Sequence, residues 1–473
     1  MGASSALRSG YVWTSPTLTW GDPRHAGDYG WSYRSDVDRD GRDAPNDGFL
    51  ALTARQIATV RFALDVDGGG PAGRAGFAVE GFTGLDVRYR AGSASADLRV
   101  ANAKDVSTAY AYQPGAGVGG DVWLGDAGDD PRAGNYDNLT MVHELGHALG
   151  LDHPHEGGRY GAVPRALDSL EFTVMTYRPW IGGPATGARF AEWSAPQTWM
   201  MLDIAALQEI YGPDYQVNAG DTVYKWKPGS GSTWVDGEVA IDPGGRVIFA
   251  TIWDGGGCDR YDLSAYASDL RVDLRPGRQS VFDPSQLADL NGGPNGGHAR
   301  GSVFNALLYD DDRRSLIEQV TGGSGDDRLI GNVGGNRLCG GAGADRLTGL
   351  AGRDALVGGR GDDVFVFGSI ASSHPSARDR IDGAGSVAAF EAPGAGRGDL
   401  IDVRGIDANV MRGGDQAFKF ASGPGIGHLW IVEIGDVTIV RGSVDRDAAA
   451  ELEIAIADDG ARFWHYTADD FLL

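Results

Sequence analysis

The sequence predicts an α+β domain followed by an all-β domain built as a parallel β-roll. Three observations lead to this expectation: a histidine motif on a helix that follows several short strand patterns, a nine-residue glycine-rich repeat in the second half, and 75 glycines among 473 residues. This glycine content is about twice the usual share. A chain of this length exceeds one ordinary core, and we expect residues 1–215 and 216–473 to form separate domains.

The chain is strongly acidic: 65 Asp and Glu residues outnumber 41 Lys and Arg residues, and the formal net charge is −24. This balance disfavours nucleic acid and anionic membranes as partners, because both are negatively charged themselves. It suits a protein that binds many divalent cations. Acidity that serves solubility alone is the simpler interpretation, but it does not explain why the aspartates recur in glycine-rich frames.

Neither a disulfide framework nor a membrane anchor is predicted. The two cysteines, Cys258 and Cys339, lie in glycine-rich segments far from the histidine motif, and we do not expect them to pair. No apolar run approaches the ~18 residues of a membrane span. Residues 1–11 lack the charged and apolar regions of a secretory signal.

Residues 1–50 are aromatic, polar and rich in turns. Within them, residues 36–47 resemble a calcium-binding loop, with Asp47 where the last ligand of a twelve-residue loop falls. However, Asp43 stands where such loops carry an apolar residue, and no helix is evident before the segment. A solvated acidic loop is therefore the favoured interpretation.

The next segments carry one helix pattern and several strand patterns. Thr53 and Gln56 have the spacing of a capping box, and the apolar residues that follow predict an amphipathic helix packed on a sheet. Alternating and β-branched residues predict strands at 85–90, 97–101, 109–112 and 122–124. An exposed edge of such a sheet can hold an extended peptide by strand addition.

The most informative stretch has the form H-E-x-x-H-x-x-G-x-x-H and begins at His143. We expect a helix over residues 138–150, on which His143 and His147 are about one turn apart and project from the same face. Two imidazoles in this relation can bind one Zn²⁺. Glu144, next to the first of them, can serve as a general base.

The rest of this motif supplies a third zinc ligand. Gly150 permits a bend after the helix, because glycine accepts a positive φ, and the returning chain can bring His153 to the metal. Three protein ligands leave a position for water, which is typical of a catalytic zinc site. A surface helix that merely carries histidines is the alternative. The added glycine and third histidine argue against it, as do the four of nine histidines between residues 143 and 155.

A second signature follows the histidine motif. Met175 stands twenty-two residues after His153 and is followed by Thr176 and Tyr177. A methionine in a tight turn below zinc-binding histidines is the Met-turn of the metzincins. A lone methionine is more often core filler, but this position favours the Met-turn.

After residue 212 the composition changes. Residues 253–262 form a first glycine–aspartate unit around Asp259. Five nonapeptides on the pattern G-G-x-G-x-D-x-U-x, in which U is apolar, then follow without a gap at 322–330, 331–339, 340–348, 349–357 and 358–366. The U residues are expected to point into the roll: Leu329, Leu338, Leu347, Leu356 and Phe365.

The nine-residue period has a physical reason. The glycine half forms a turn whose carbonyl and carboxylate oxygens bind Ca²⁺, and the other half forms a short strand. Glycine-rich disorder is the alternative, but it predicts no fixed register. The expected calcium ligands are Gly323, Gly325, Asp327, Gly341, Gly343, Asp345, Asp354, Gly359, Gly361, Asp363 and Asp259.

Two of the five repeats depart from the pattern. The second has Asn332 in place of Gly and Asn336 in place of Asp, and the fourth has Leu350 in place of Gly. Calcium sites that border these turns are expected to be weaker or absent. Residues 367–473 are expected to be β-rich, with a hairpin turning at residues 435–436.

The residues His153-Pro154 together with Met175-Thr176-Tyr177 resemble the serralysin branch of the metzincins (peptidase family M10B), secreted zinc proteases of Gram-negative bacteria with RTX repeats. The resemblance extends from about residue 50 onward, and residues 195–212 are similar to the helix that closes the catalytic domain. It implies that Tyr177 reaches the zinc as a displaceable ligand and donates to the developing oxyanion. The ending at 469–473, acidic and then apolar, resembles that of family members exported by the type I secretion machinery.

The resemblance thus implies a secreted, extracellular, monomeric metalloendopeptidase that acts on proteins and peptides, with one catalytic Zn²⁺ and several structural Ca²⁺. Zinc held by the three histidines would activate a water, and Glu144 would take its proton and deliver it to the leaving amine. Family members are made with a short N-terminal propeptide. No propeptide is evident in the sequence: either residues 1–10 are its remnant, or the protein lacks one.

Two other classes of function remain as alternatives. One is a calcium-dependent extracellular binding or structural protein with an inert metzincin domain, in which we would expect Glu144 or a histidine ligand to be lost; all are present. The other is a different RTX enzyme such as a lipase, which needs a G-x-S-x-G elbow. The sequence contains no such elbow.

Overall fold

The computed structural model describes residues 2–33, 45, 48–67, 76–104, 106–447, 449–457 and 463–473. The calcium-like pattern at residues 36–47 therefore lies outside the described residues, apart from residue 45. The chain forms two compact units. The N-terminal unit comprises Met1–Thr222, Gly229–Gly257 and Pro284–Ser315, and the C-terminal unit Val223–Pro228, Cys258–Asp283 and Leu316–Leu473. The division expected at residues 215 and 216 stays a prediction.

In the part of the N-terminal unit that the structure describes, four α-helices combine with short strands. Its helices are α1 (Ala54–Leu64), α2 (Val79–Phe82), α3 (Tyr136–Ala148) and α4 (Met201–Tyr211). Its strands are β1 (Thr17–Gly21), β2 (Phe49–Leu50), β3 (Asp86–Tyr89), β4 (Leu98–Ala103), β5 (Ala109–Ala111), β6 (Asp121–Leu124), β8 (Thr233–Val235), β9 (Glu238–Ile241), β10 (Ala250–Ile252) and β14 (Val303–Asn305).

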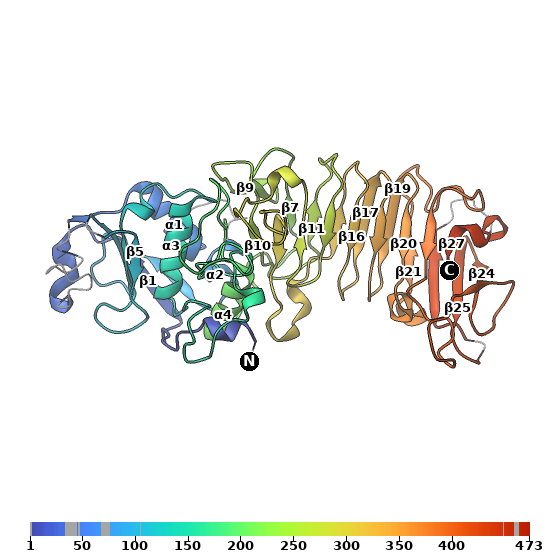
Figure 1. The fold of residues 1–473 in the computed structure, drawn as a ribbon, viewed down its shortest axis with the longest axis horizontal. Coiled ribbons are helices and arrows are strands. Elements are labelled where there is room, and N and C mark those ends of the chain that lie inside the picture. The colour runs from blue at the N-terminus through green and yellow to red at the C-terminus, as the bar shows by residue number, and fades with distance from the viewer. Residues whose placement is uncertain are drawn as a thin grey trace. The chain divides into compact units, whose positions relative to one another are not determined.

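One sheet of this unit has the strand order β3-β1-β4-β6-β5, and β2 also pairs with β4. Strands β3, β1, β4 and β6 are parallel, whereas β5 runs antiparallel to β6 at the edge. Helix α1 begins with the predicted capping box: Gln56 N donates to Thr53 Oγ1 at 3.2 Å, and Thr53 N donates to Gln56 Oε1 at 2.8 Å. Figure 1 shows α1 and α3 beside one another next to this sheet.

Helix α3 begins two residues before the predicted start, because Asn135 caps it. The Asn135 side chain accepts a hydrogen bond from Asn138 N at 2.9 Å, which satisfies one of the free N–H groups at a helix start. Val142, Leu145 and Leu149 are buried in the main core of the unit together with residues of α1 and α4. Leu139 is also buried there, but it lies one turn before His143 on the same side of the helix. The packing of the other three residues fixes the face that carries the histidines.

The C-terminal unit is almost entirely β. Its strands are β7 (Val223–Lys225), β11 (Arg260–Asp262), β12 (Arg271–Asp273), β13 (Gln279–Ser280), β15 (Gln319–Thr321), β16 (Arg328–Ile330), β17 (Arg337–Ala342), β18 (Arg346–Thr348), β19 (Ala355–Arg360), β20 (Val364–Val366), β21 (Asp379–Ile381), β22 (Leu400–Asp402), β23 (Lys419–Phe420), β24 (His428–Ile434), β25 (Val437–Ser443), β26 (Leu452–Ile456) and β27 (Phe471–Leu472).

Two parallel sheets of this unit form the predicted β-roll. One contains the strands in the order β7-β11-β15-β17-β19-β21-β26, and the other has the order β12-β16-β18-β20-β22-β27. Partners such as Leu329 and Leu347, or Leu338 and Leu356, are two nonapeptides apart, so each coil of the roll consumes two repeats. All five predicted inward residues, including Phe365, are 0% exposed. Figure 1 shows the strands of this unit stacked in succession.

The predicted hairpin is present: β24 and β25 are antiparallel, with Ile434 opposite Val437, and β26 extends the pair. The α+β domain followed by a parallel β-roll, predicted from the sequence, is confirmed. Among the described residues, none of the helices has both the length and the apolar character that crossing a membrane requires.

Candidate metal centres

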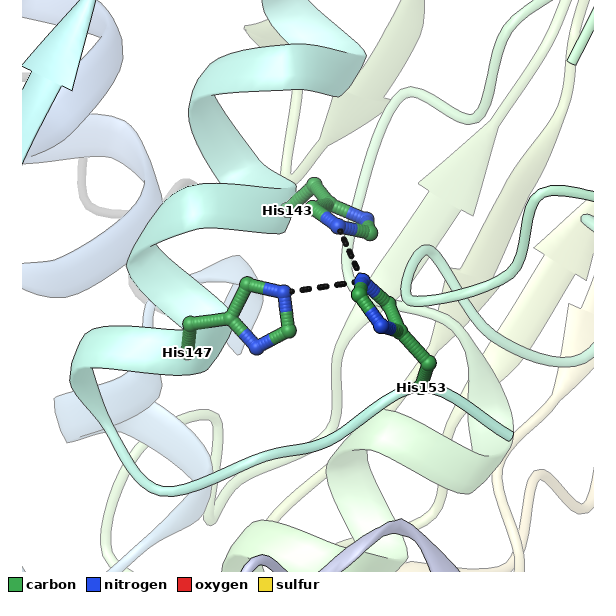
Figure 2. Close-up of side chains that lie close together, drawn as sticks. All are labelled: His143, His147 and His153. Carbon is green, nitrogen blue, oxygen red and sulfur yellow. Dashed lines mark hydrogen bonds between the residues drawn. The ribbon is translucent and has the colours of Figure 1, made fainter. Parts of the chain in front are cut away.

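Three histidine rings from α3 and the loop after it converge on one point (Figure 2). His143 and His147 project from α3, and Gly150 has a φ of +99°, which turns the chain back as predicted. The returning loop places His153 Nε2 at 3.3 Å from His143 Nε2 and at 3.1 Å from His147 Nε2. The structure therefore brings together all three histidines that the sequence singled out.

The other ring nitrogen of each histidine, Nδ1, faces an oxygen atom. His143 Nδ1 lies 2.9 Å from Val174 O, and His147 Nδ1 lies 2.9 Å from Leu151 O. His153 Nδ1 lies 3.0 Å from Glu156 Oε1. A neutral ring that donates through Nδ1–H has a lone pair on Nε2. The three lone pairs therefore meet at one point.

This arrangement fits a zinc ion. Three lone pairs that face one another repel, and only a cation between them turns the repulsion into attraction. A tetrahedral ion with Zn–N bonds of about 2.0–2.1 Å holds its nitrogen ligands about 3.3 Å apart. The measured separations of 3.1 and 3.3 Å are close to that spacing. Ring acceptors of the kind seen here are the usual partners of zinc-binding histidines.

Burial keeps the rings neutral, as metal binding requires. Desolvation, followed by the neighbouring His147, holds the pKa of His143 well below its usual range. Desolvation and then His153 lower the pKa of His147 to about 4. Both rings are thus unprotonated at neutral pH and available as ligands.

Glu144 and Tyr177 lie at the same centre. Both line a cleft of about 440 Å³ with His143, Leu139 and Thr140. Burial raises the pKa of Glu144 to about 8. The Tyr177 ring lies 4.6 Å from the His153 ring between centroids, and burial, followed by Glu144, raises the pKa of its phenol to about 12.

The Met-turn lies below the histidines and is held by a buried carboxylate from α4. A Cβ on Gly146 would meet Met175 Sδ, so this helix position has to be glycine. Asp203, 0% exposed, accepts from Thr173 Oγ1 at 2.5 Å, from Val174 N at 2.8 Å and from Met200 N at 3.0 Å. Since Val174 O is the acceptor of His143 Nδ1–H, Asp203 helps to fix that ring. Asp203 was not predicted as part of the site, because an aspartate in the first turn of a helix is typical of helix capping.

In the β-roll, the predicted aspartates form two rows along successive coils. In one row Asp327 N donates to Asp345 Oδ1 at 2.8 Å, and Asp345 N donates to Asp363 Oδ1 at 2.9 Å. In the other row Asn336 N donates to Asp354 Oδ1 at 2.8 Å. The turn glycines fit closely: Gly341 and Gly359 have φ values of +118° and +115°. A Cβ on Gly341 would clash with Gly323 O, and a Cβ on Gly359 would clash with Gly341 O. In the same way, a Cβ on Gly343 would clash with Gly325 O, and a Cβ on Gly361 with Gly343 O.

These rows fit calcium ions. The Oδ2 atoms of four buried aspartates have no hydrogen-bond partner among the described residues: Asp345, Asp354, Asp363 and Asp379. A buried carboxylate oxygen without a partner is costly, and a hard cation that takes several oxygen ligands is the partner it lacks. Asp327 differs, because Gly323 N and Leu270 N donate to its two oxygens. Asp259 is buried at the head of β11, where its N–H donates to Glu318 Oε2.

Two members of the rows were missed in the sequence. Asp354 N donates to Asp379 Oδ1 at 2.9 Å, and Asp363 N donates to Asp399 Oδ1 at 2.9 Å. Both aspartates lie beyond the last nonapeptide, but each precedes an apolar strand residue by two positions, as in the repeats. That D-x-U signal identifies them. At the departing repeat, Asn336 Nδ2 donates to Glu318 O, so its amide is satisfied within the protein.

Comparisons with known proteins identify a family and several relatives. Residues 213–292 match the family model Peptidase M10 serralysin C terminal, and residues 317–347 and 340–369 match the RTX calcium-binding nonapeptide repeat. The chain is 38% identical to a serralysin of Proteus mirabilis over 183 residues, 36% of this chain and 35% of the relative. It is 33% identical to the metallopeptidase AprA of Pseudomonas marginalis over 353 residues (69% and 66%) and 38% identical to the metalloprotease AprA of Pseudomonas entomophila over 263 residues (53% and 48%).

The matched regions span 35% to 66% of the length of these relatives. The family models cover the serralysin C-terminal region and the repeats, and the match to the Pseudomonas marginalis relative covers more than half of this chain. The chain therefore belongs to the serralysin-type family of metalloproteases with RTX calcium-binding repeats.

Proposed function

We propose that this protein is a secreted, calcium-stabilised zinc endopeptidase that hydrolyses peptide bonds of polypeptides. The observation that carries the proposal is the convergence of three histidine Nε2 atoms, each with its Nδ1 held by an oxygen, beside Glu144 in an open cleft. Three protein ligands leave one coordination position of a zinc ion open, and Glu144 supplies an acid–base group beside it. This combination is typical of a catalytic zinc site.

His143, His147 and His153 would hold the zinc ion. Once bound, zinc supplies Lewis-acid polarisation of the scissile carbonyl and lowers the pKa of a coordinated water. Glu144 takes a proton from the attacking water and delivers it to the leaving amine. Burial favours the protonated form of Glu144, and the charge of a bound zinc ion would favour its carboxylate. With these two opposing effects, the pKa of Glu144 suits a group that accepts and returns a proton near neutral pH.

Tyr177 is proposed as the donor to the oxyanion. Its raised pKa keeps the phenol protonated at neutral pH, so the hydroxyl can donate to negative charge that develops on the carbonyl oxygen. Its ring lies against His153 and also stacks on His143 at 5.7 Å between centroids. It is equally proposed as a displaceable ligand of the zinc.

The substrate backbone is proposed to add to β5. This strand is at the edge of its sheet, and Thr108 and Ala109 at its start line the cleft. An edge strand offers unpaired N–H and C=O groups to an extended peptide. The bound chain would then run past Glu144 with its scissile bond within reach.

Export is proposed to precede folding. The rows of buried aspartates need calcium to fold, so a chain kept unfolded at low calcium can leave through the type I secretion machinery and fold outside the cell as a monomer. The net charge of −24 favours such an extended state, because like charges repel.

The test is hydrolysis of casein in calcium by wild type, by Glu144→Gln, and by wild type with a zinc chelator. Glu144→Gln should lower kcat by about 10²–10⁴-fold with zinc content unchanged, and the chelator should abolish activity. Glu192→Gln, at an exposed glutamate outside the cleft, is the matched control and should match wild type. Folded, zinc-loaded wild type no more active than Glu144→Gln would contradict the proposal and favour a binding protein.

A further inference from the structure

A second group of potential metal ligands lies directly after the third histidine. His153, His155 and Glu156 each offer one ligand atom, and these three atoms all lie within 4.8 Å of one another. The His155 ring is parallel to the His153 ring within 19°, at 5.4 Å between centroids. In Figure 2, one ring nitrogen of His153 faces His143 and His147, and the other faces away from them. Glu156 Oε1 lies 3.0 Å from His153 Nδ1 and accepts from it.

One ring nitrogen of His155 lacks a hydrogen-bond partner in the part of the chain that the structure describes. This nitrogen, Nδ1, is buried. The ring is instead held by ring contacts: it stacks on His153, and it lies at 5.2 Å between centroids from Tyr177, tilted by 47°. A histidine nitrogen that is buried without a partner loses the free energy of a hydrogen bond. A metal ion is one partner that can restore it.

The charges around this group favour a cation. Glu156 is a carboxylate with more than half of its side chain exposed, so it can move to a new partner at little cost. Asp152, next in the same loop, accepts from His153 N with its Oδ1. The positive charge of Arg178 opposes a cation near His155. However, Asp168 Oδ2 lies 2.8 Å from Arg178 Nε, and its negative charge offsets that of the guanidinium.

We propose that His155 and Glu156, beside His153, form a second and weaker site for a divalent transition-metal ion, and that its occupation inhibits the peptidase. The proposal rests on the function proposed above. One imidazole and one carboxylate suit Zn²⁺, whereas Ca²⁺ prefers oxygen ligands only. With fewer protein ligands than the three-histidine centre, this site fills only when zinc is in excess.

Inhibition follows from the contact that the second ion breaks. Glu156 Oε1 now accepts from His153 Nδ1–H and so orients the third ligand of the catalytic centre. A cation that takes this carboxylate removes the acceptor, and loss of such a ring acceptor weakens metal affinity or activity about 10–100-fold. The His155 ring also moves toward the ion and disturbs Tyr177, whose ring it contacts.

The experiment measures bound zinc and peptide hydrolysis in the same samples. The full-length protein, in saturating calcium, is dialysed against rising concentrations of zinc chloride, and wild type is compared with His155→Ala and Glu156→Gln. Each activity is normalised to that of the same variant at low zinc. His298→Ala, at an exposed histidine outside the group, controls for zinc held by surface imidazoles.

Wild type and His298→Ala should bind one zinc per chain more than His155→Ala and Glu156→Gln, and activity should fall as that ion binds. In the two variants, the zinc concentration for half inhibition should rise about ten-fold or more. Equal zinc stoichiometry in all four proteins, or the same inhibition midpoint, would overturn the proposal. The zinc stoichiometry also distinguishes the two proposals. If the protein binds a second zinc ion but never cleaves casein, the second metal site is supported and the proposed peptidase function is contradicted.

Discussion

The histidine centre and the aspartate rows solve the same problem, holding a divalent cation, with opposite electrostatics. The three histidines are neutral ligands, and burial lowers the pKa of His143 and His147, so nothing charged is left when the metal leaves. The aspartates are anionic ligands whose Oδ2 atoms are buried without partners. Burial raises the pKa of Asp379 and Asp363, and a neighbouring aspartate raises each further. The first site can exist without its metal, whereas the second is unstable without it.

This contrast separates two metals by function. In the proposed function zinc is required for chemistry, and α3, the loop after Gly150 and the Met-turn preform its site. Calcium is proposed to be required for folding, because its expected ligands come from successive coils whose carboxylates repel one another without it. The four predictions below test this contrast, from the largest expected effect to the smallest.

Removing calcium should unfold the C-terminal unit. With a calcium-selective chelator, the far-UV circular dichroism of the β-roll should be lost almost completely, and the unit should become sensitive to added protease, since the carboxylates lose their only cation. A zinc-selective chelator should abolish casein hydrolysis and leave the spectrum unchanged, because the rings stay neutral. The same spectrum with and without calcium would refute the contrast.

Acid should partly replace calcium in the β-roll. Burial raises the pKa of Asp345 and Asp363 to about 7 and that of Asp379 to about 8. A folded-state pKa above the unfolded value of about 3.9 gives stability that is complete below that value and lost as pH rises through about 7 to 8. In chelator, β-structure should therefore return as pH is lowered from about 8 to 5.

With calcium present the sign reverses, because protons compete with the ion for the same carboxylates. Circular dichroism across this pH range, in both conditions, checks the prediction. A calcium-free protein that stays equally unfolded from pH 8 to pH 5 would show that carboxylate charge is not what prevents folding.

Asp203→Asn should weaken the zinc centre without contacting it. An amide has one acceptor oxygen, whereas Asp203 accepts from three donors and so holds Val174, the acceptor of His143. We expect zinc affinity and kcat to fall about ten-fold, with KM unchanged and the absorption of the cobalt-substituted protein altered. Asp214→Asn, just past the end of α4, is the control. Loss of thermal stability alone, with an unchanged cobalt spectrum, would assign Asp203 a structural role only.

Leu350→Gly should slightly stabilise the β-roll. Leu350 has a φ of +77° at the repeat position where Gly341 and Gly359 have positive φ values. A leucine in this region costs about 1–2 kcal/mol, partly offset by the greater freedom of glycine when unfolded, so a net gain below about 1 kcal/mol is expected. Calcium-saturated denaturant unfolding measures it, and destabilisation would mean that the leucine side chain contributes more by packing than its backbone costs.

Local spacing determined much of the chemistry from the sequence alone. His143 and His147 share a helix face because they are four residues apart, and Gly150 supplies the positive φ that returns His153. The nine-residue period likewise predicted the roll and its inward residues, Leu329 and its equivalents, because the same short turn and strand recur in every repeat. Such features depend on neighbours in the chain, and residue type encodes them directly.

Only the tertiary structure decided what surrounds the metals. The acceptors of His143 and His147 are the backbone carbonyls of Val174 and Leu151, which any residue type provides, so no sequence pattern marks them. Asp203 reaches the Met-turn across about thirty residues of chain. Asp399 enters its row from thirty-six residues beyond Asp363, after a segment that breaks the repeat. The sequence indicated the three histidines and most of the row aspartates, but not the residues that position them, because long-range contacts follow from the packing of the whole unit.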